Sequence, residues 1–322
     1  MNIAAKKSET AKKRCASSHL TLIKKDFLKH KYLYFMALPV FLFYLIFHYF
    51  PMYGTIIAFK NFSPALGVFN SPWASSGGLA HFINFISGPF FWRLLRNTLL
   101  ISAYDIIFTF PTAIIFAILL NEVRCNPFKR VVQTVTYLPH FISMVVVCGL
   151  INVFVNSDGF INDLIVLFGG ERSYLLANPK MFRPIYIASN IWHQFGWNSI
   201  VYIAALTNVD REQYEAAKID GAGIIRQMIS VTLPGIMPTI VTMFILRMGQ
   251  VLMVGYEKVI LLYNSATLET ADVISSFVYR QGLEASDYSY STAVNLMNSV
   301  VNFLMVFLTN TISRKVSETS LW

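Results

Sequence analysis

Polar side chains inside long apolar segments are the residues of this sequence best able to bind a solute. Segment 184–206 carries several of them at or beside helical spacing: Asn190, His193, Gln194, Trp197 and Asn198. Polar groups are costly in hydrocarbon, so they face a cavity or another helix and are candidates for function. Amides hydrogen-bond hydroxyl groups and aromatic rings pack on sugar faces, so the stripe holds the kinds of side chain that a sugar pathway would use. Hydrogen bonding between helices is the alternative role.

Later apolar segments add further candidates. Arg247 and Gln250 lie together, and Asn298 shares a helical face with Asn295 and Asn302. A mid-span arginine costs roughly 2.5–3.5 kcal/mol on insertion scales, so Arg247 must face a cavity or pair with an acid. It either binds an acidic sugar or pairs with a partner subunit. The asparagines either line the pathway or bond helix to helix.

A single carboxylate, Asp105, lies in apolar segment 98–120. It raises the idea of proton coupling, but no second acid is placed to relay a proton. We therefore expect Asp105 to be paired structurally.

Several kinds of site are excluded by spacing. The six histidines and three cysteines show no metal-ligand pattern, and no nucleophile and base cluster together, so we predict no metal site and no catalytic residue. Gly221-Ala222-Gly223 begins like a dinucleotide fingerprint, but no strand precedes it and Arg226 replaces the last glycine. The chain also has no Gly-x-x-x-x-Gly-Lys-Ser/Thr loop, so it cannot cradle ATP phosphates itself.

Membrane-spanning helices must position these residues. The 322-residue chain is 55% hydrophobic and only 13% charged, a composition typical of polytopic membrane proteins. Segments long enough to cross hydrocarbon must be helical, because their backbone groups find no water there. We therefore predict an all-α membrane protein with six transmembrane helices, over 32–50, 98–120, 131–155, 184–206, 237–262 and 291–312.

Basic residues predict the orientation of these spans. With the N-terminus inside, 17 of the 26 Lys and Arg residues fall on cytoplasmic pieces: tail 1–31, loops 121–130 and 207–236, and tail 315–322 with Arg314 just before it. The net charge of +9 is concentrated before the first span, which favours anionic lipid over nucleic acid as its partner. Residues 20–28 either form an interfacial helix or begin the first span, which is too long for a signal peptide.

The polar loop 207–236 has helix-starting and helix-ending residues. Asp210 can cap a helix over 211–220, and Gly221 can end it in a left-handed conformation. A second helix can then run toward Val231, before Pro234 interrupts it. The loop is therefore predicted to be a helix–turn–helix on the cytoplasmic face of domain 32–314.

The spacing inside this loop is specific. Glu215-Ala216-Ala217 is followed by three residues and Gly221, then by nine residues, Val231, one residue and Leu233-Pro234. This pattern resembles the EAA loop of transmembrane subunits of binding-protein-dependent ABC importers, with Val231 in place of the usual isoleucine. The resemblance implies a coupling helix that docks on an ATPase. Glu215, Ala216, Ala217 and Gly221 would make the contact and turn, and Leu233 and Pro234 would close the motif.

Other segments extend the resemblance over most of residues 20–322. Arg96-Asn97-Thr98-Leu99, the run 137–143 (Tyr-Leu-Pro-His-Phe-Ile-Ser) and the C-terminal Glu-Thr-Ser-Leu-Trp resemble oligosaccharide and polysaccharide permeases of Gram-positive bacteria. That branch is similar to the larger permease subunit of the maltose importer. This chain lacks that subunit's large outer insertion and its two extra spans.

The resemblance implies a non-enzymatic permease subunit in a bacterial cell membrane, with both termini cytoplasmic. Its partners would be a different permease chain in a hetero-dimer, two ATPase subunits and an extracellular sugar-binding lipoprotein. No cofactor is expected in this chain, because ATP and Mg²⁺ would be bound by the ATPases, which drive alternating access. The alternatives are a stand-alone ion- or proton-coupled carrier and a membrane enzyme. The sequence leaves open whether the sugar is neutral or uronic.

Overall fold

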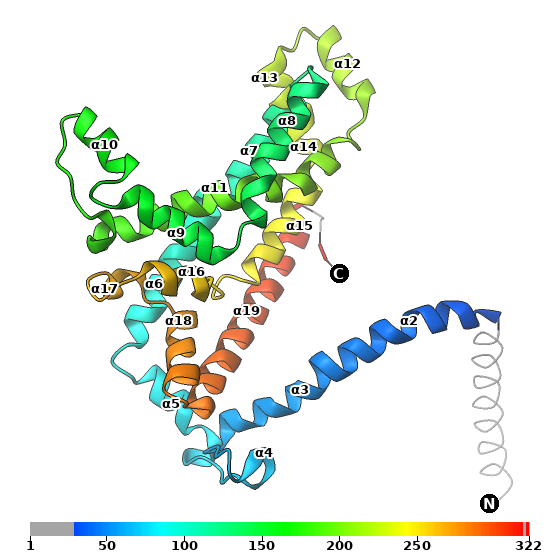
Figure 1. Cartoon of the computed structure of the whole chain (residues 1–322). Coiled ribbons are helices and arrows are strands. Elements are labelled where there is room, and N and C mark those ends of the chain that lie inside the picture. Colours follow the sequence, from blue (N-terminus) through cyan, green and yellow to red (C-terminus); the bar gives the residue numbers. More distant parts are fainter. Residues whose placement is uncertain (1–28, 318–319, 322) are drawn as a thin grey trace, which may run out of the picture. The chain divides into compact units, whose positions relative to one another are not determined.

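The computed structural model describes residues 29–317 and 320–321 (Figure 1). These residues form helices and connecting loops with no β-strand, and an isolated antiparallel bridge joins Lys60 to Trp73. The possible interfacial helix over 20–28 and most of the C-terminal motif 318–322 lie outside the described residues. The chain divides after Ile56 into two compact units, each described by itself.

The first unit is a run of apolar helix. It comprises α2 (Lys31–Tyr44), the π-helical turn η1 (Leu45–Tyr49), α3 (Phe50–Met52) and the start of the 3₁₀ helix η2 (Tyr53–Phe59). Within α2 no side chain is buried. Phe43 and Phe47 contact each other at a ring-centroid distance of 5.2 Å. The stretch contains the predicted first span and is long and apolar enough to cross a membrane.

The second unit contains the remaining helices. The first half has α4 (Gly67–Asn70), η3 (Ser76–Gly78), α5 (Ala80–Ile86), α6 (Phe91–Tyr104), η4 (Asp105–Thr109), α7 (Phe110–Asn121), α8 (Asn126–Tyr137), η5 (Leu138–Phe141), α9 (Met144–Val155) and α10 (Phe160–Leu167). The second half has η6 (Leu175–Ala177), α11 (Pro179–Leu206), α12 (Arg211–Ile219), α13 (Ile224–Gln227), η7 (Met228–Thr232), α14 (Leu233–Gly235), α15 (Met237–Met248), α16 (Tyr256–Leu262), α17 (Leu268–Ala271), α18 (Ile274–Tyr279), η8 (Arg280–Glu284) and α19 (Tyr288–Ser317).

Length and apolarity agree with part of the six-span prediction. Among the described residues, four helical stretches could cross a membrane: Lys31–Phe59, Phe91–Asn121, Met144–Leu167 and Tyr288–Lys315. A fifth arises if α13–α14 and α15, bent by 61°, count as one span. The 28-residue α11 contains the predicted fourth span but carries the polar stripe that lowers its apolarity.

The predicted third span, 131–155, is interrupted in the structure. Helix α8 ends at Tyr137, and Ile142 and Ser143 are extended before α9 begins at Met144. Pro139 lies in the first turn of η5. Proline cannot donate the backbone hydrogen bond that a continuous helix would need. The sequence-based prediction of one continuous span is therefore wrong here.

The predicted fifth span, 237–262, is also interrupted, because α15 ends at Met248 and α16 begins only at Tyr256. Side chains from other helices satisfy the backbone between them. Asn302 Oδ1 accepts the Leu252 N–H at 3.1 Å, and Ser102 donates to the Val251 carbonyl. Irregular backbone at membrane depth is tolerated where such partners bury it. Asn302 thus bonds to another segment's backbone, as the helix-bonding alternative for the asparagines allowed.

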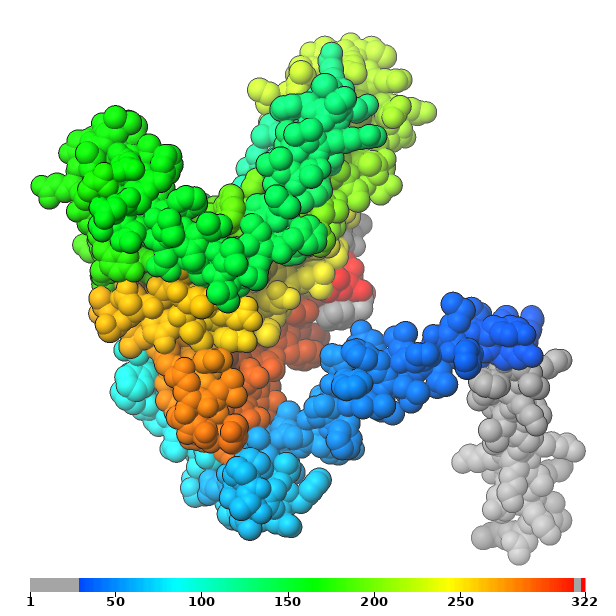
Figure 2. All heavy atoms as spheres, viewed as in Figure 1, coloured from blue at the N-terminus to red at the C-terminus, as the bar shows by residue number. Residues whose placement is uncertain are grey.

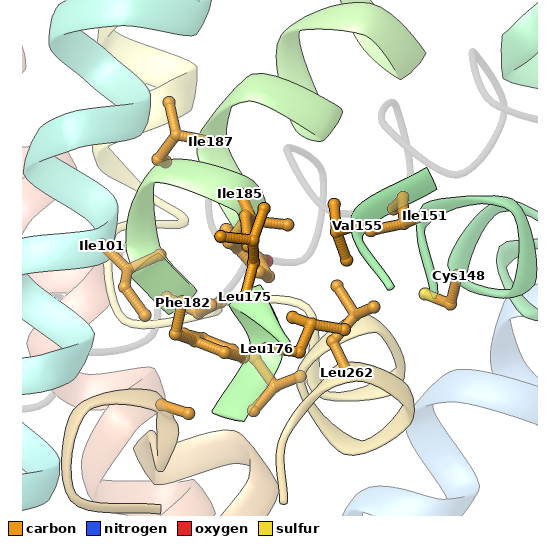
Figure 3. Packing of buried hydrophobic residues seen from close by; sticks show 14 of the residues in the cluster. Ile101, Cys148, Ile151, Val155, Leu175, Leu176, Phe182, Ile185, Ile187 and Leu262 are labelled. Carbon is orange, nitrogen blue, oxygen red and sulfur yellow. The ribbon is translucent and has the colours of Figure 1, made fainter. Parts of the chain in front are cut away.

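Two packing features hold α11 in place. Figure 3 shows the largest buried cluster, in which Phe182 and Leu176 are each 1% exposed and pack with residues of α9 and α16. Helix α8 approaches α11 at Gly196, where a β-carbon would overlap the carbonyl oxygen of Thr136. In lipid, helices associate through close packing of this kind rather than through the hydrophobic effect. The polar stripe of α11 is therefore fixed against its neighbours.

Candidate functional site

A cavity of about 560 Å³ lies between α6–α7, α11, α15 and the segment 253–258. Six of the predicted pathway residues line it: Asn190, Gln194, Trp197, Asn198, Arg247 and Gln250. Three tyrosines also line the cavity: Tyr186, Tyr202 and Tyr256. The cavity thus combines amides, aromatic rings and charged groups.

Asp105 and Arg247 form an ion pair in the cavity wall. The Asp105 carboxylate is 5% exposed, and its other oxygen accepts a hydrogen bond from Asn190 at 2.5 Å. The structural pairing expected for Asp105 is therefore present. Arg247 finds its acid within this chain, so it needs no partner subunit for neutralisation. Its side chain keeps 38% of its surface exposed and still faces the cavity.

Two predicted pathway residues do not line the cavity. His193 is buried, and its Nδ1 contacts the Gln194 amide at 2.9 Å. Asn298 is buried on α19, and its Oδ1 has no hydrogen-bond partner among the described residues. His140 stacks on Trp197 with ring centroids 4.4 Å apart. It lies in the run 137–143 and could have been recognised there as a neighbour of the site.

Lys258 is a cavity residue that the sequence did not single out. It is 3% exposed, and its Nζ donates to the Tyr186 carbonyl at 3.0 Å. The ammonium also lies 4.5 Å from the centroid of the Tyr186 ring. A continuous fifth span would have placed Lys258 at an outer helix end. The break over 249–255 instead brings it into the wall.

A second charged cluster lies around Asp272, which is 1% exposed. Arg280 binds both carboxylate oxygens at 2.7 and 2.8 Å, and Arg93 approaches one of them at 3.3 Å. Burial lowers the pKa of Arg280, but its hydrogen bond and attraction to Asp272 raise that pKa above its usual value overall. Asn97 donates to the carbonyl groups of Asp272 and Glu269. This cluster joins α6 to the segment 269–280 and does not line the cavity.

The polar loop begins as the sequence predicts but continues differently. The Asp210 side chain accepts the Glu212 N–H at 3.0 Å at the start of α12, and Gly221 has φ +76°. The next helix, however, begins at Ile224 and passes through the π-helical turn η7 into α14. Pro234 does not end it, and lies in α14 directly after the π-helical turn η7. The chain bends after it, between α14 and α15.

The residues of the predicted docking motif lie mostly at the surface. Glu215, Ala216, Gly221 and Pro234 are exposed, and Ala217 and Leu233 are partly buried. Four isoleucines are also exposed around the turn: Ile219, Ile224, Ile225 and Ile229. The loop, yellow-green in Figure 2, reaches the molecular surface on the face shown. Tyr214 donates from its hydroxyl to Thr232 Oγ1 at 3.0 Å, which ties α12 to η7.

The described residues contain no group of three or more His, Cys, Asp or Glu side chains arranged to hold a metal ion.

Comparisons with known proteins show which family and which relatives this chain resembles. Residues 109–318 match the family model described as binding-protein-dependent transport system inner membrane component. A polygalacturonan/rhamnogalacturonan transport system permease of Bacillus subtilis (strain 168) is 45% identical, over 92% of this chain and 91% of the relative. An arabinooligosaccharide transport system permease of the same organism is 26% identical, over 88% of each chain.

A solved structure agrees with these matches. A chain in the crystal structure of a bacterial alginate ABC transporter, in complex with its alginate pentasaccharide-bound periplasmic protein, superposes with a TM-score of 0.83. It is 40% identical, over 92% of this chain and 99% of that chain. The protein therefore belongs to the family of binding-protein-dependent transport system inner membrane components, and it is a multi-pass membrane permease subunit of an ABC transporter.

Proposed function

We propose that this chain forms part of the pathway through which an ABC importer takes up oligosaccharides, with ATP hydrolysed by separate subunits. The observation that carries the proposal is the cavity, where Asn190, Gln194, Asn198 and Gln250 present amides beside Trp197. Sugar rings offer hydroxyl groups to amides and apolar faces to indole. The named relatives transport uronic-acid polymers in one case and arabinooligosaccharides in another, so the family alone leaves the sugar open.

The described residues show no comparable feature in support of a stand-alone proton-coupled carrier. The acid buried in the cavity wall, Asp105, is bound by both Arg247 and Asn190. A proton relay needs a carboxylate that gains and loses its proton during transport. Both carboxylate oxygens of Asp105 are instead engaged by side chains of this chain.

We infer six spans for the whole chain, with α11 as the span of lowest apolarity. A helix that lines an aqueous pathway need not be apolar on all sides, because only its outer face meets lipid. Both termini and the loop 207–236 then lie in the cytoplasm of a bacterial cell, as the basic residues indicate.

The loop is proposed to be the docking element for an ATPase. Its exposed isoleucines surround the Gly221 turn, and Glu215 adds a carboxylate for a basic partner. Charge pairs of this kind fix register more than affinity. The Tyr214–Thr232 hydrogen bond would pass a displacement of α12 to η7, and so toward α15.

The complete importer is proposed to contain a second, different permease chain, two ATPase subunits that bind ATP and Mg²⁺, and a sugar-binding lipoprotein outside. The alginate transporter structure includes a substrate-bound periplasmic protein, which supports the last of these. No cofactor is proposed for this chain itself, and no catalytic role.

Paired glycine substitutions test the docking role. Gly221 has φ +76° and Gly223 has φ −69°, and a β-carbon on either would meet no atom within 4 Å. Valine therefore strains only the first, by roughly 1–2 kcal/mol in the left-handed region. If docking needs this turn, Gly221→Val weakens ATPase association by roughly 5–30-fold, and Gly223→Val leaves it nearly unchanged. Co-purification of ATPase with the solubilised chain measures this. Equal behaviour of the two variants, or no ATPase bound to the wild type, would refute docking here.

A further inference from the structure

The ionisable residues that line the cavity differ in how their charges are neutralised. Asp105 and Arg247 pair with each other, and the Glu257 side chain is exposed. Lys258 is 3% exposed, and no carboxylate of the described residues lies within ion-pair distance of it. The cavity wall therefore holds one buried positive charge without an ion-paired counter-charge.

The surroundings of Lys258 leave part of its binding capacity unused. An ammonium has three N–H donors. One donates to the Tyr186 carbonyl at 3.0 Å, and the Tyr186 ring gives a cation–π contact at 4.5 Å. Neither group carries a full negative charge. A buried charge is costly unless it is paired and hydrogen-bonded, so a ligand anion would complete this site.

We propose that Lys258 binds the carboxylate of a uronic-acid residue, and that it gives the importer a preference for acidic oligosaccharides. This proposal rests on the proposed function, because it assumes that saccharides enter the cavity. The sequence suggested Arg247 as the residue that binds an acidic sugar, but Asp105 already neutralises it. The proposal assigns that binding to Lys258 instead. Gln250, Asn198 and the rings of the cavity would contact the neutral parts of the sugar.

A purely structural role for Lys258 predicts a different result. If the ammonium only holds the Tyr186 carbonyl against α16, its loss should impair the transport of every sugar alike. If it binds carboxylate, the loss should depend on the charge of the sugar. Lys60 provides a matched control outside the cavity. It is 5% exposed, donates to the carbonyls of Val68 and Phe69, and lies 5.3 Å from the Trp73 ring centroid.

The test uses the full transporter, with its partner subunits and binding protein, in proteoliposomes. ATP-dependent uptake is measured for a labelled oligogalacturonide and for the same oligosaccharide with its carboxyl groups reduced. Lys258→Met should lower oligogalacturonide uptake by about tenfold or more, the scale of a lost charge-assisted hydrogen bond, and spare the reduced sugar. Lys258→Arg should retain uptake of both, and Lys60→Met should not change the ratio between the sugars.

Equal losses for the two sugars, or no loss in Lys258→Met, would overturn the proposal. So would a wild-type transporter that imports only the reduced sugar. If the wild type imports only the acidic sugar, Lys258→Arg becomes the control. Retained uptake with arginine and lost uptake with methionine then support carboxylate binding, and equal loss in both refutes it. A wild type that imports neither sugar with ATP would instead contradict the proposed function.

Discussion

Removing one partner of the Asp105–Arg247 ion pair should destabilise the protein unequally, depending on which partner is removed. Arg247→Met leaves a carboxylate that is 5% exposed with only the Asn190 amide as a hydrogen-bond partner. Asp105→Asn leaves an arginine whose side chain keeps 38% of its surface exposed and can be hydrated. Arg247→Met, which leaves the acid unpaired, should therefore lower the free energy of unfolding more than Asp105→Asn does.

The magnitudes follow from this difference in burial. Breaking a buried pair by removing one partner costs about 3–5 kcal/mol, and we take about 3 for Arg247→Met because the pair borders a cavity. Exposed charges pair weakly, so Asp105→Asn should cost about 1 kcal/mol. The double variant leaves no orphaned charge and should cost about 1 kcal/mol as well. The singles add to about 4 kcal/mol, so the coupling free energy is about 3 kcal/mol.

Thermal unfolding of the purified transporter in detergent measures these effects. At about 2 °C per kcal/mol, Arg247→Met should lower the midpoint by about 6 °C, and Asp105→Asn and the double variant by about 2 °C each. The ordering is the critical result. The reasoning is refuted if Asp105→Asn is as destabilising as Arg247→Met, or if the double variant shows the sum of the single effects.

Two further substitutions test the packing that forms the cavity. Gly196→Ala should destabilise the protein by several kcal/mol, because the added methyl group overlaps the Thr136 carbonyl oxygen. Gly149→Ala is the control: it has open space around it and should be neutral or mildly stabilising in the same thermal unfolding assay. Asn302→Leu should cost about 1–3 kcal/mol and speed amide hydrogen exchange at Leu252, whose N–H loses its acceptor. Unchanged exchange would show that another group satisfies that N–H.

The sequence predicted the helical class and six of the polar and aromatic residues that line the cavity. Polar groups at helical spacing are unusual in apolar segments, because placing them in lipid is costly. Asn190, Gln194 and Trp197 could therefore be identified from the sequence alone. The same argument required a partner or a cavity for Arg247, which has both. His193 and Asn298 were expected in the same pathway, but they do not line the cavity. Periodicity gives a face of a helix and does not say which neighbour that face meets.

The helix breaks could not be predicted from local sequence. A glycine such as Gly249 or Gly255 permits an interruption but does not require one. What stabilises the break over 249–255 is a set of side chains on distant helices, including Asn302 and Ser102, which satisfy its backbone. Because Asn302 and Ser102 lie 50 and 149 residues away from their partners in the chain, no sequence window around the break contains the information. Lys258 was missed for the same reason.

The polar loop and the cavity share one helix, and this limits how a signal can pass between them. Helix α15 begins at Met237, directly after the bend that ends the loop, and carries Arg247 ten residues later. At 1.5 Å per residue that distance is about 15 Å of regular helix. A tilt of α15 imposed at the loop would therefore displace Arg247 relative to its ion-pair partner Asp105 on η4. If this ion pair is either formed or broken, with no state between, a small tilt of α15 would break it. The charged groups that face a sugar in the cavity would then change.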